Sequence, residues 1–145
     1  MTLSVHLRDI EVFDALPATL EDKYYVPLSA NFAGIDALIK DAALQYTISP
    51  THPIKGVQNV RQLMSLFLPR SLDLVFIVPE SIATDFCAQD ILTTKSHGIK
   101  QKNMPVRQFV VGVPLQVGID TSSNKNCKLS QDWGLHWRYG EIQDK

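Results

Sequence analysis

The sequence predicts an α/β fold, with a central mixed β-sheet flanked by helices. Two short apolar segments, residues 35–39 and 44–48, flank a polar corner, which is typical of a β-hairpin. From Val57 onward the apolar residues recur at helical spacing. Residues 74–78, Leu-Val-Phe-Ile-Val, form a continuous apolar run typical of a strand buried on both faces. A helix between strands requires a crossover, so we expect parallel pairing beside the hairpin in one sheet.

Length and composition narrow the class of protein. The chain has 145 residues, 45% hydrophobic and 20% charged, which fits one domain with a true core. A net charge of −1 excludes a general basic field for nucleic acid, so phosphate binding must come from a local patch. Cys87 and Cys127 lack the spacing of metal ligands and are expected to be free thiols. No apolar run reaches membrane length and no signal-peptide core is present, so we expect an intracellular domain without membrane contact.

The N-terminal part is predicted to contain short strands. Apolar and polar residues alternate through Leu3, Val5 and Leu7 and, after a phase shift at Asp9, through Ile10 and Val12. This pattern favours a strand with a bulge, and a short helix is the alternative. Pro17 ends the element. Capping-box character at residues 19–22 predicts a brief helical turn, and the aromatic residues at 24–27 favour a strand.

The part that follows the hairpin alternates helices and strands. Two prolines make residues 49–53 a loop. The next helix ends before Pro69, and its predicted apolar face comprises Val57, Val60, Leu63, Met64, Leu66 and Phe67. After the buried strand, a second helix is predicted from Pro79 to about Ala88. A polar loop at residues 93–104 carries Lys95, Lys100 and Lys102, and a final strand is predicted at 108–113.

The domain organisation follows from where this pattern ends. Residues 1–115 are predicted to form one domain, and residues 116–145 a C-terminal tail without a clear secondary-structure signal. Trp133 and Trp137 give that tail apolar area with which to anchor itself.

The hairpin also carries the candidate functional site. In its second strand Leu44, Tyr46 and Ile48 point to one face, while Gln45 and Thr47 point to the other. Asp36 is expected in the first strand, opposite this pair. An acid on one strand and a polar-x-polar pair on its neighbour are typical of a metal-dependent nuclease site.

Several phrases in the chain resemble a known family. They are residues 16–22 (LPATLED), 24–27 (YYVP), 31–37 (NFAGIDA), 44–49 (LQYTIS), 52–55 (HPIK), 74–79 (LVFIVP) and 108–113 (QFVVGV). Their order and spacing resemble the PD-(D/E)XK restriction-endonuclease-like superfamily, in the lineage found in crinkler-type effectors and retrotransposon hot spot proteins. The resemblance covers about residues 16–115.

The resemblance implies roles for the hairpin residues. Asp36 matches the metal-binding aspartate, Gln45 stands at the position of the second acid, and Thr47 stands at the position of the lysine. The superfamily also supplies an acid from a helix ahead of the hairpin. Glu11, Glu21 and Asp22 do not fit that context, so the chain is expected to lack this first helix and to be part of a longer protein with other domains.

These residues favour a Mg²⁺ site with reduced strength. Asp36 supplies one carboxylate, and the Gln45 carbonyl can ligate a cation but adds no charge. Thr47 can form hydrogen bonds but cannot replace an ammonium group beside a phosphate. Lys55 can serve instead, because it precedes a helix whose backbone N–H groups favour phosphate. His52 is a candidate acid or base near neutral pH.

Each candidate also has a plainer structural interpretation. Asp36 can be a solvated acid at a hairpin end, and Gln45 and Thr47 the polar face of a half-exposed strand. His52 can be an ordinary loop residue. The lysines of residues 93–104 can form a solvated loop, with a DNA-facing loop as the alternative. His136 and the two tryptophans favour packing of the tail over base stacking.

Two functional hypotheses follow. The first is a metal-dependent nuclease domain that acts on DNA, with Asp36, Gln45, Thr47 and Lys55 as its catalytic residues and Asp36 and Gln45 as its metal ligands. The second is an interaction or DNA-binding module that keeps the nuclease fold without the chemistry. The resemblance to crinkler-type effectors also implies action in the nucleus.

Overall fold

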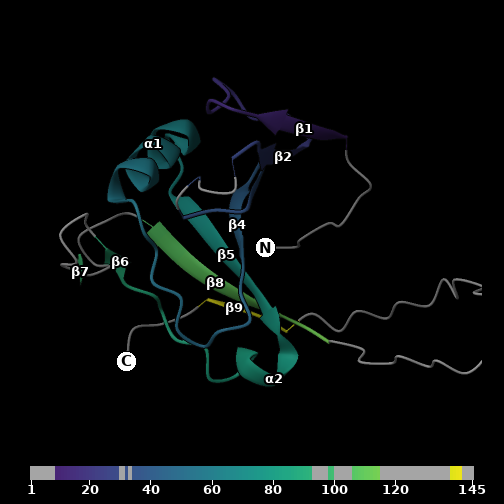
Figure 1. Cartoon of the computed structure of the whole chain (residues 1–145), viewed down its shortest axis with the longest axis vertical. Helices are drawn as coiled ribbons and strands as arrows, with labels where there is room; N and C mark the ends of the chain where they lie inside the picture. The colour runs from purple at the N-terminus through teal and green to yellow at the C-terminus, as the bar shows by residue number, and fades with distance from the viewer. Residues whose placement is uncertain are drawn as a thin grey trace, which may run out of the picture.

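A mixed β-sheet forms the centre of the molecule in the computed structural model, which describes residues 9–29, 32, 34–92, 98–99, 106–114 and 138–141. Within these residues, seven strands pair in the order β1-β2-β3-β4-β5-β8-β9 (Figure 1). Their bounds are β1 Ile10–Phe13, β2 Tyr24–Pro27, β3 Ala37–Ile39, β4 Ala42–Tyr46, β5 Leu72–Pro79, β8 Val106–Val113 and β9 Arg138–Glu141. The class is therefore α/β, as the sequence predicts.

The strand directions change along the chain. Strands β2, β3 and β4 form an antiparallel meander, and β4, β5 and β8 are parallel to one another. The connection from β4 to β5 contains helix α1 (Val57–Phe67), and the connection from β5 to β8 contains helix α2 (Glu80–Ala83) and the small hairpin of β6 (Ile91–Leu92) and β7 (Gly98–Ile99). Figure 1 shows β5 and β8 side by side through the centre of the sheet.

The sheet has a buried cluster on each face. One contains Leu38, Ala43, Leu74 and Phe76 from the strands, together with the buried residues of both helices: Val57, Val60, Leu63, Phe67 and Ala83. Both helices therefore pack against the same face. The other cluster contains Ala37, Ile39, Ala42, Leu44, Val75, Phe109 and Val111. Neighbouring residues of β5 alternate between the two clusters, which confirms that this strand is buried on both faces.

The predicted hairpin is confirmed with different bounds: its first strand is shorter than predicted, and its second strand begins and ends earlier in the chain. Its turn consists of Lys40 and Asp41, which brings Ala42 opposite Ile39. The sequence predicts Asp36 inside the first strand, which is wrong. The strand begins at Ala37, and Asp36 directly precedes it. The C-terminal end of α1 is tied to this turn, because Arg70 donates to the Asp41 carboxylate at 2.7 Å and to the Lys40 carbonyl at 3.0 Å.

The second predicted helix is wrong in length. It ends at Ala83 rather than near Ala88, and residues 86–90 have irregular backbone. The reason is a tertiary contact: Gln89 pairs its backbone N–H and C=O with the side-chain amide of Gln108 at 2.8 and 2.9 Å. A helix through this segment would use those groups internally and lose that pairing.

Other expectations have mixed outcomes. The predicted helical turn at residues 19–22 is wrong, because that segment has bends and no helix. The strand prediction is confirmed for Ile10–Phe13, whereas residues 1–8 lie outside the described part of the chain. Residues 138–141 of the predicted tail form β9, which pairs with β8. No helix among the described residues has the length and apolar character needed to cross a membrane.

Candidate functional site

Asp36 is hydrogen-bonded to the backbone of β4 at Tyr46, the residue between Gln45 and Thr47. The backbone N–H of Tyr46 donates to Asp36 Oδ2 at 2.8 Å, and the backbone N–H of Asp36 donates to the Leu44 carbonyl at 2.9 Å. Ala37 pairs with Leu44, and Asp36 also donates its N–H to the Leu44 carbonyl, so the regular register of the hairpin ends at Ala37. The Asp36 carboxylate therefore contacts the backbone of the residue between Gln45 and Thr47, and the Asp36 side chain is exposed to solvent.

Gln45 is a buried polar residue with one unsatisfied atom. Its side chain is only 7% exposed, and its Nε2 lies 2.6 Å from Nε2 of His52. Its Oε1 is buried and has no hydrogen-bond partner within the described part of the chain. A buried, unpaired amide oxygen costs about 1–3 kcal/mol, so the fold carries this group at a loss. Gln45 is thus not the polar face of a half-exposed strand.

Thr47 contacts His52 as well. Thr47 Oγ1 lies 3.4 Å from His52 Nδ1, and it accepts the backbone N–H of Ser49 at 3.1 Å. The hydroxyl in turn donates to the Ser49 carbonyl at 3.5 Å. His52 therefore bridges the two predicted site residues, Gln45 at one ring nitrogen and Thr47 at the other.

Two buried glutamines hold the His52 loop in place. Gln89 Oε1 accepts the backbone N–H of His52 at 2.5 Å, and Gln89 Nε2 donates to the carbonyls of Cys87 at 2.6 Å and Pro50 at 3.3 Å. Gln89 is itself held by Gln108, which is completely buried. Sequence reasoning missed this network. Its signal was a glutamine at the start of an otherwise apolar strand.

Lys55 comes close to the hairpin because of a glycine. Gly34 has φ +95°, and a Cβ on it would lie 3.1 Å from the Lys55 carbonyl and 3.4 Å from Ile54 Cγ2. The backbone of residues 54–55 thus passes directly beside the segment that leads into Asp36. Lys55 is exposed and is followed by Gly56, the N-cap of α1, which has φ 79° and no side-chain cap. The start of α1 therefore has backbone N–H groups without side-chain caps, and Lys55 directly precedes it in the chain.

Two tyrosines from β2 and β4, Tyr24 and Tyr46, contact each other beside Asp36. The hydroxyl groups of Tyr24 and Tyr46 are hydrogen-bonded to each other. Burial, the hydrogen bond to Tyr24 and the charge of Asp36 raise the pKa of Tyr46 above its usual value. Tyr46 therefore stays neutral at physiological pH, and it adds no second negative charge beside Asp36.

The residues of the site offer few ligands to a hard cation. Mg²⁺ in proteins is bound through one or two carboxylates, keeps several waters and completes its shell with phosphate oxygens. Asp36 offers one carboxylate, and the unpaired Gln45 Oε1 is an oxygen donor already stripped of water. Among the described residues no group of three or more His, Cys, Asp or Glu side chains converges. The net donor charge of −1 predicts weak affinity.

The other predicted contributors have different outcomes. Lys95, Lys100, Lys102, His136 and the two tryptophans lie outside the described residues, so the DNA-facing loop stays a prediction. Glu11 and Glu21 pair with Lys23, at 2.9 and 3.1 Å. These contacts raise the pKa of Lys23 and place both acids in a surface ion-pair cluster. Cys87 is a free, exposed thiol, as expected.

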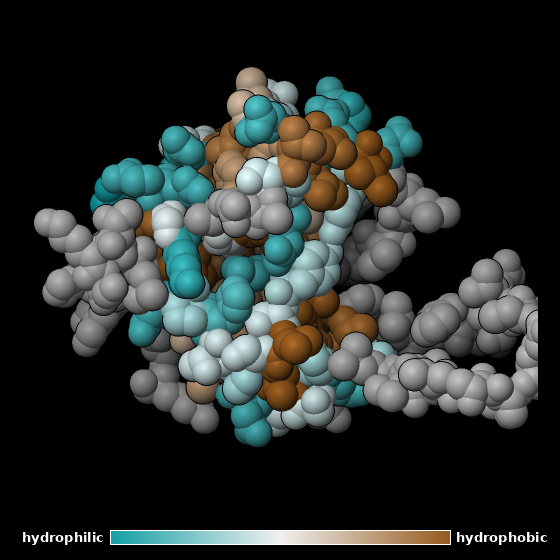
Figure 2. All heavy atoms as spheres, in the orientation of Figure 1, coloured by the Kyte–Doolittle hydropathy of each residue, from teal (hydrophilic) through white to brown (hydrophobic). Residues whose placement is uncertain are grey.

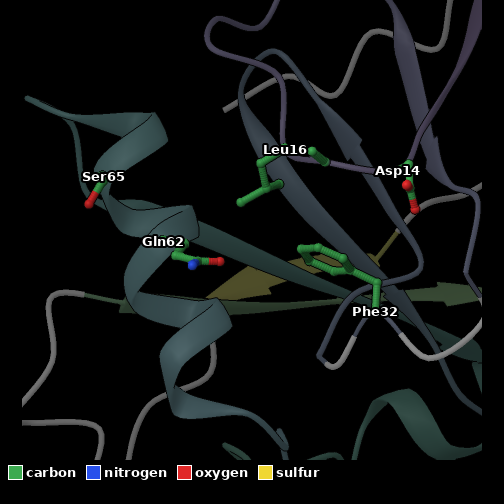
Figure 3. Close-up of a pocket in the computed structure, with 6 residues that line it drawn as sticks. Asp14, Leu16, Phe32, Gln62 and Ser65 are labelled. Carbon is green, nitrogen blue, oxygen red and sulfur yellow. The ribbon is translucent and has the colours of Figure 1, made fainter.

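A second concave region lies beside α1. The cavity has a volume of about 520 Å³ and is lined by Asp14, Ala15, Leu16, Phe32, Gln62 and Ser65. Figure 3 shows Gln62 extending from α1 toward Leu16 and Phe32 across the hollow. Its labelled side chains offer one carboxylate and no nucleophile–base pair. It is separate from the Asp36 site.

An apolar surface surrounds the edge strand. Figure 2 shows hydrophobic atoms gathered near β1 and β2. The exposed apolar side chains there are Ile10, Val12 and Leu28, which are 70%, 58% and 68% exposed. Strand β3 separates this surface from Gln45 on β4, so it does not form part of the site.

Comparison with known proteins adds no relative. No protein-family model, no curated protein and no solved structure matches the chain. The site therefore has to be interpreted from its own residues: one exposed acid, one buried amide with an unpaired oxygen, and a histidine that contacts both Gln45 and Thr47.

Proposed function

We propose that this chain is a metal-dependent nuclease domain of the PD-(D/E)XK type, which hydrolyses phosphodiester bonds in DNA with the aid of a weakly held Mg²⁺ ion. The observation that carries the proposal is the hydrogen bond from the Tyr46 N–H to Asp36 Oδ2. It holds the acid at the backbone of Tyr46, the residue that follows Gln45 in the chain, and the buried, unpaired Gln45 Oε1 is the second oxygen donor of the proposal.

The topology around the hairpin supports the same proposal. An antiparallel meander of three strands is followed by α1 and then by a strand parallel to β4. This arrangement agrees with the restriction-endonuclease-like core that the sequence resemblance implies.

Each residue has a defined task in the proposed reaction. Asp36 and Gln45 Oε1 hold the cation, and the chemistry that it supplies when bound is polarisation of a phosphoryl oxygen. Lys55 and the first N–H groups of α1 orient the phosphate and neutralise its charge. Thr47 holds His52 through its hydroxyl and moves no proton. Because the donor charge is only −1, we expect slow hydrolysis that rises with cation concentration up to the millimolar range, the weak end for oxygen-ligand sites.

The second candidate is a DNA-binding or interaction module without catalysis. The position of Thr47 favours it, because the hydroxyl that replaces an ammonium group is used by Ser49 and His52. Under this alternative, Lys55 and α1 hold phosphate and no bond is broken. The two candidates differ in whether DNA is cut.

Nicking of supercoiled plasmid in Mn²⁺ tests the proposal. Asp36→Asn should abolish nicking, and Gln45→Glu should increase it because a second carboxylate strengthens the cation site. Asp41→Asn is the matched control, since it removes the same charge from the turn of the same hairpin and should leave nicking unchanged. Equal nicking by the parent and Asp36→Asn contradicts the proposal. Absence of nicking by the parent and by Gln45→Glu, with DNA binding retained, selects the module.

A further inference from the structure

We propose that strand β1 is the surface through which two copies of this chain associate, by antiparallel pairing of β1 with β1 of the second copy. The inference goes beyond the proposed function and does not depend on it. Within the described residues β1 ends the seven-stranded sheet, so the sheet uses only one side of its backbone. Natural edge strands that stay unpaired often carry lysine, proline or a bulge. Strand β1 has neither lysine nor proline, and its register with β2 is regular.

Ile10 and Val12 present the outer side of this strand. Strand β1 is parallel to β2, and the carbonyls of Asp9 and Phe13 accept backbone N–H groups at 2.9 and 2.7 Å, from Tyr24 and from the residue after β2. Because alternate residues direct their backbone groups to opposite sides, Ile10 and Val12 direct theirs away from β2. Their side chains are 70% and 58% exposed, on the face opposite to that of the buried Phe13. The same two residues thus offer both the hydrogen bonds and the apolar contact that a further strand needs.

The edge is complementary to itself in one register. In an antiparallel pair, residues whose backbone groups face the partner stand opposite one another, so even-numbered positions of β1 face even-numbered positions. The register with Ile10 opposite Val12 sets apolar side chains against each other twice, once on each side of the two-fold axis. A shift by two residues sets Ile10 opposite Asp14 in one direction, and Asp9 opposite Glu11 in the other, and both pairs are unfavourable. The two-fold axis passes through Glu11, so the contact closes as a dimer.

The charges at this axis are balanced. Glu11 stands opposite Glu11 of the second copy, and two carboxylates alone would repel each other. Each Glu11, however, is paired with Lys23 of its own chain at 2.9 Å. The axis therefore brings two ammonium groups and two carboxylates together on one face of the sheet, and the apolar pairs lie on the other face.

Sedimentation equilibrium of the full chain, over a concentration series that reaches the millimolar range, tests the association. The parent should show a weak monomer–dimer equilibrium, because short contacts that bury less than about 1,200 Å² are typical of transient complexes. Val12→Lys should weaken dimerisation at least about 10-fold, since the symmetry places the added charge in the contact twice. Ile48→Lys is the matched control: this residue is 84% exposed and lies outside β1, so the equilibrium should not change. Urea midpoints establish that both variants fold.

Disulfide trapping tests the register. In a background with Cys87→Ser and Cys127→Ser, Glu11→Cys should form a covalent dimer on oxidation. The Cα atoms of such a non-hydrogen-bonded pair lie about 4.5 Å apart, within reach of a disulfide. Val12→Cys is the control, because it faces Ile10 of the second copy and should cross-link less. Glu11→Cys keeps the test decisive if Val12→Lys does not fold.

Three outcomes overturn the inference. The first is a parent that stays monomeric throughout, which would leave the edge to a strand of another protein. The second is a Val12→Lys dimer as stable as that of the parent. The third is cross-linking of Val12→Cys in preference to Glu11→Cys. Concentration-dependent dimers that are lost in Val12→Lys, retained in Ile48→Lys and trapped by Glu11→Cys support it.

Discussion

Replacing Gln45 by methionine should stabilise the fold although it removes a hydrogen bond. Methionine has nearly the same length and fills the same space with apolar atoms. The change loses the contact with His52, worth about 0.5–1.5 kcal/mol, and removes the buried unpaired Oε1, which costs about 1–3 kcal/mol. The expected net effect is a gain of about 1 kcal/mol, or roughly 3 °C in melting temperature for a chain of this size.

The same substitution at Gln108 should have the opposite sign. Both glutamines are buried on the face that the helices cover, but both amide atoms of Gln108 are used. Gln108→Met leaves the backbone N–H and C=O of Gln89 without these partners, which should destabilise the fold by about 2–5 kcal/mol. Gln108→Met is therefore a matched control for Gln45→Met.

Urea denaturation followed by far-ultraviolet circular dichroism measures both changes. If Gln45 is an oxygen donor kept unpaired for a ligand, Gln45→Met raises the free energy of unfolding while it abolishes cation binding, a trade of stability against function. If Gln45→Met destabilises the chain as much as Gln108→Met does, Oε1 is satisfied in the native protein and the reasoning is refuted.

Two further predictions concern the stability of the fold. Gly34→Ala should cost about 1–3 kcal/mol, because φ is +95° and the new Cβ meets the Lys55 carbonyl at 3.1 Å; an unchanged urea midpoint would contradict this account. Arg107→Met should cost about 1–3 kcal/mol, because Asp73 is buried and loses a bidentate partner, although the half-exposed arginine lets water screen part of the loss. Arg70→Met is its control, at about 0–1 kcal/mol, since both members of that pair are exposed; equal costs for the two would argue against the burial of Asp73 as the cause.

Much of the fold could be predicted because local pattern and tertiary structure agree there. The apolar run at residues 74–78 needs two covered faces, and β5 has them. The helical spacing from Val57 gives α1 its buried side, with Val60, Leu63 and Phe67 packed against the sheet. The short polar corner predicts the hairpin. Because its turn is only Lys40 and Asp41, the second strand begins at Ala42, and the first strand is shortened at its other end, where it begins at Ala37.

The departures arise where a distant residue overrides the local preference. The second helix stops early because Gln89 pairs with Gln108, which lies 19 residues further along the chain. At the site, the alternation of one strand predicts Gln45 and Thr47 on one face, and the hairpin pattern predicts Asp36 on the neighbouring strand. The sequence could not show that Gln45 is buried, or that His52 contacts Gln45 at one ring nitrogen and Thr47 at the other. These contacts form because the loop after β4 returns His52 to the end of that strand.

Paramagnetic broadening by Mn²⁺ of backbone amide signals tests the central claim most directly, because it locates the cation on the hairpin without requiring cleavage. The account predicts selective broadening at residues 35–37 and 45–47 at substoichiometric Mn²⁺, and its loss in Asp36→Asn but not in Asp41→Asn. Absence of broadening at the hairpin, or broadening confined to the ion-pair cluster of Glu11 and Glu21, would contradict a cation site formed by Asp36 and Gln45.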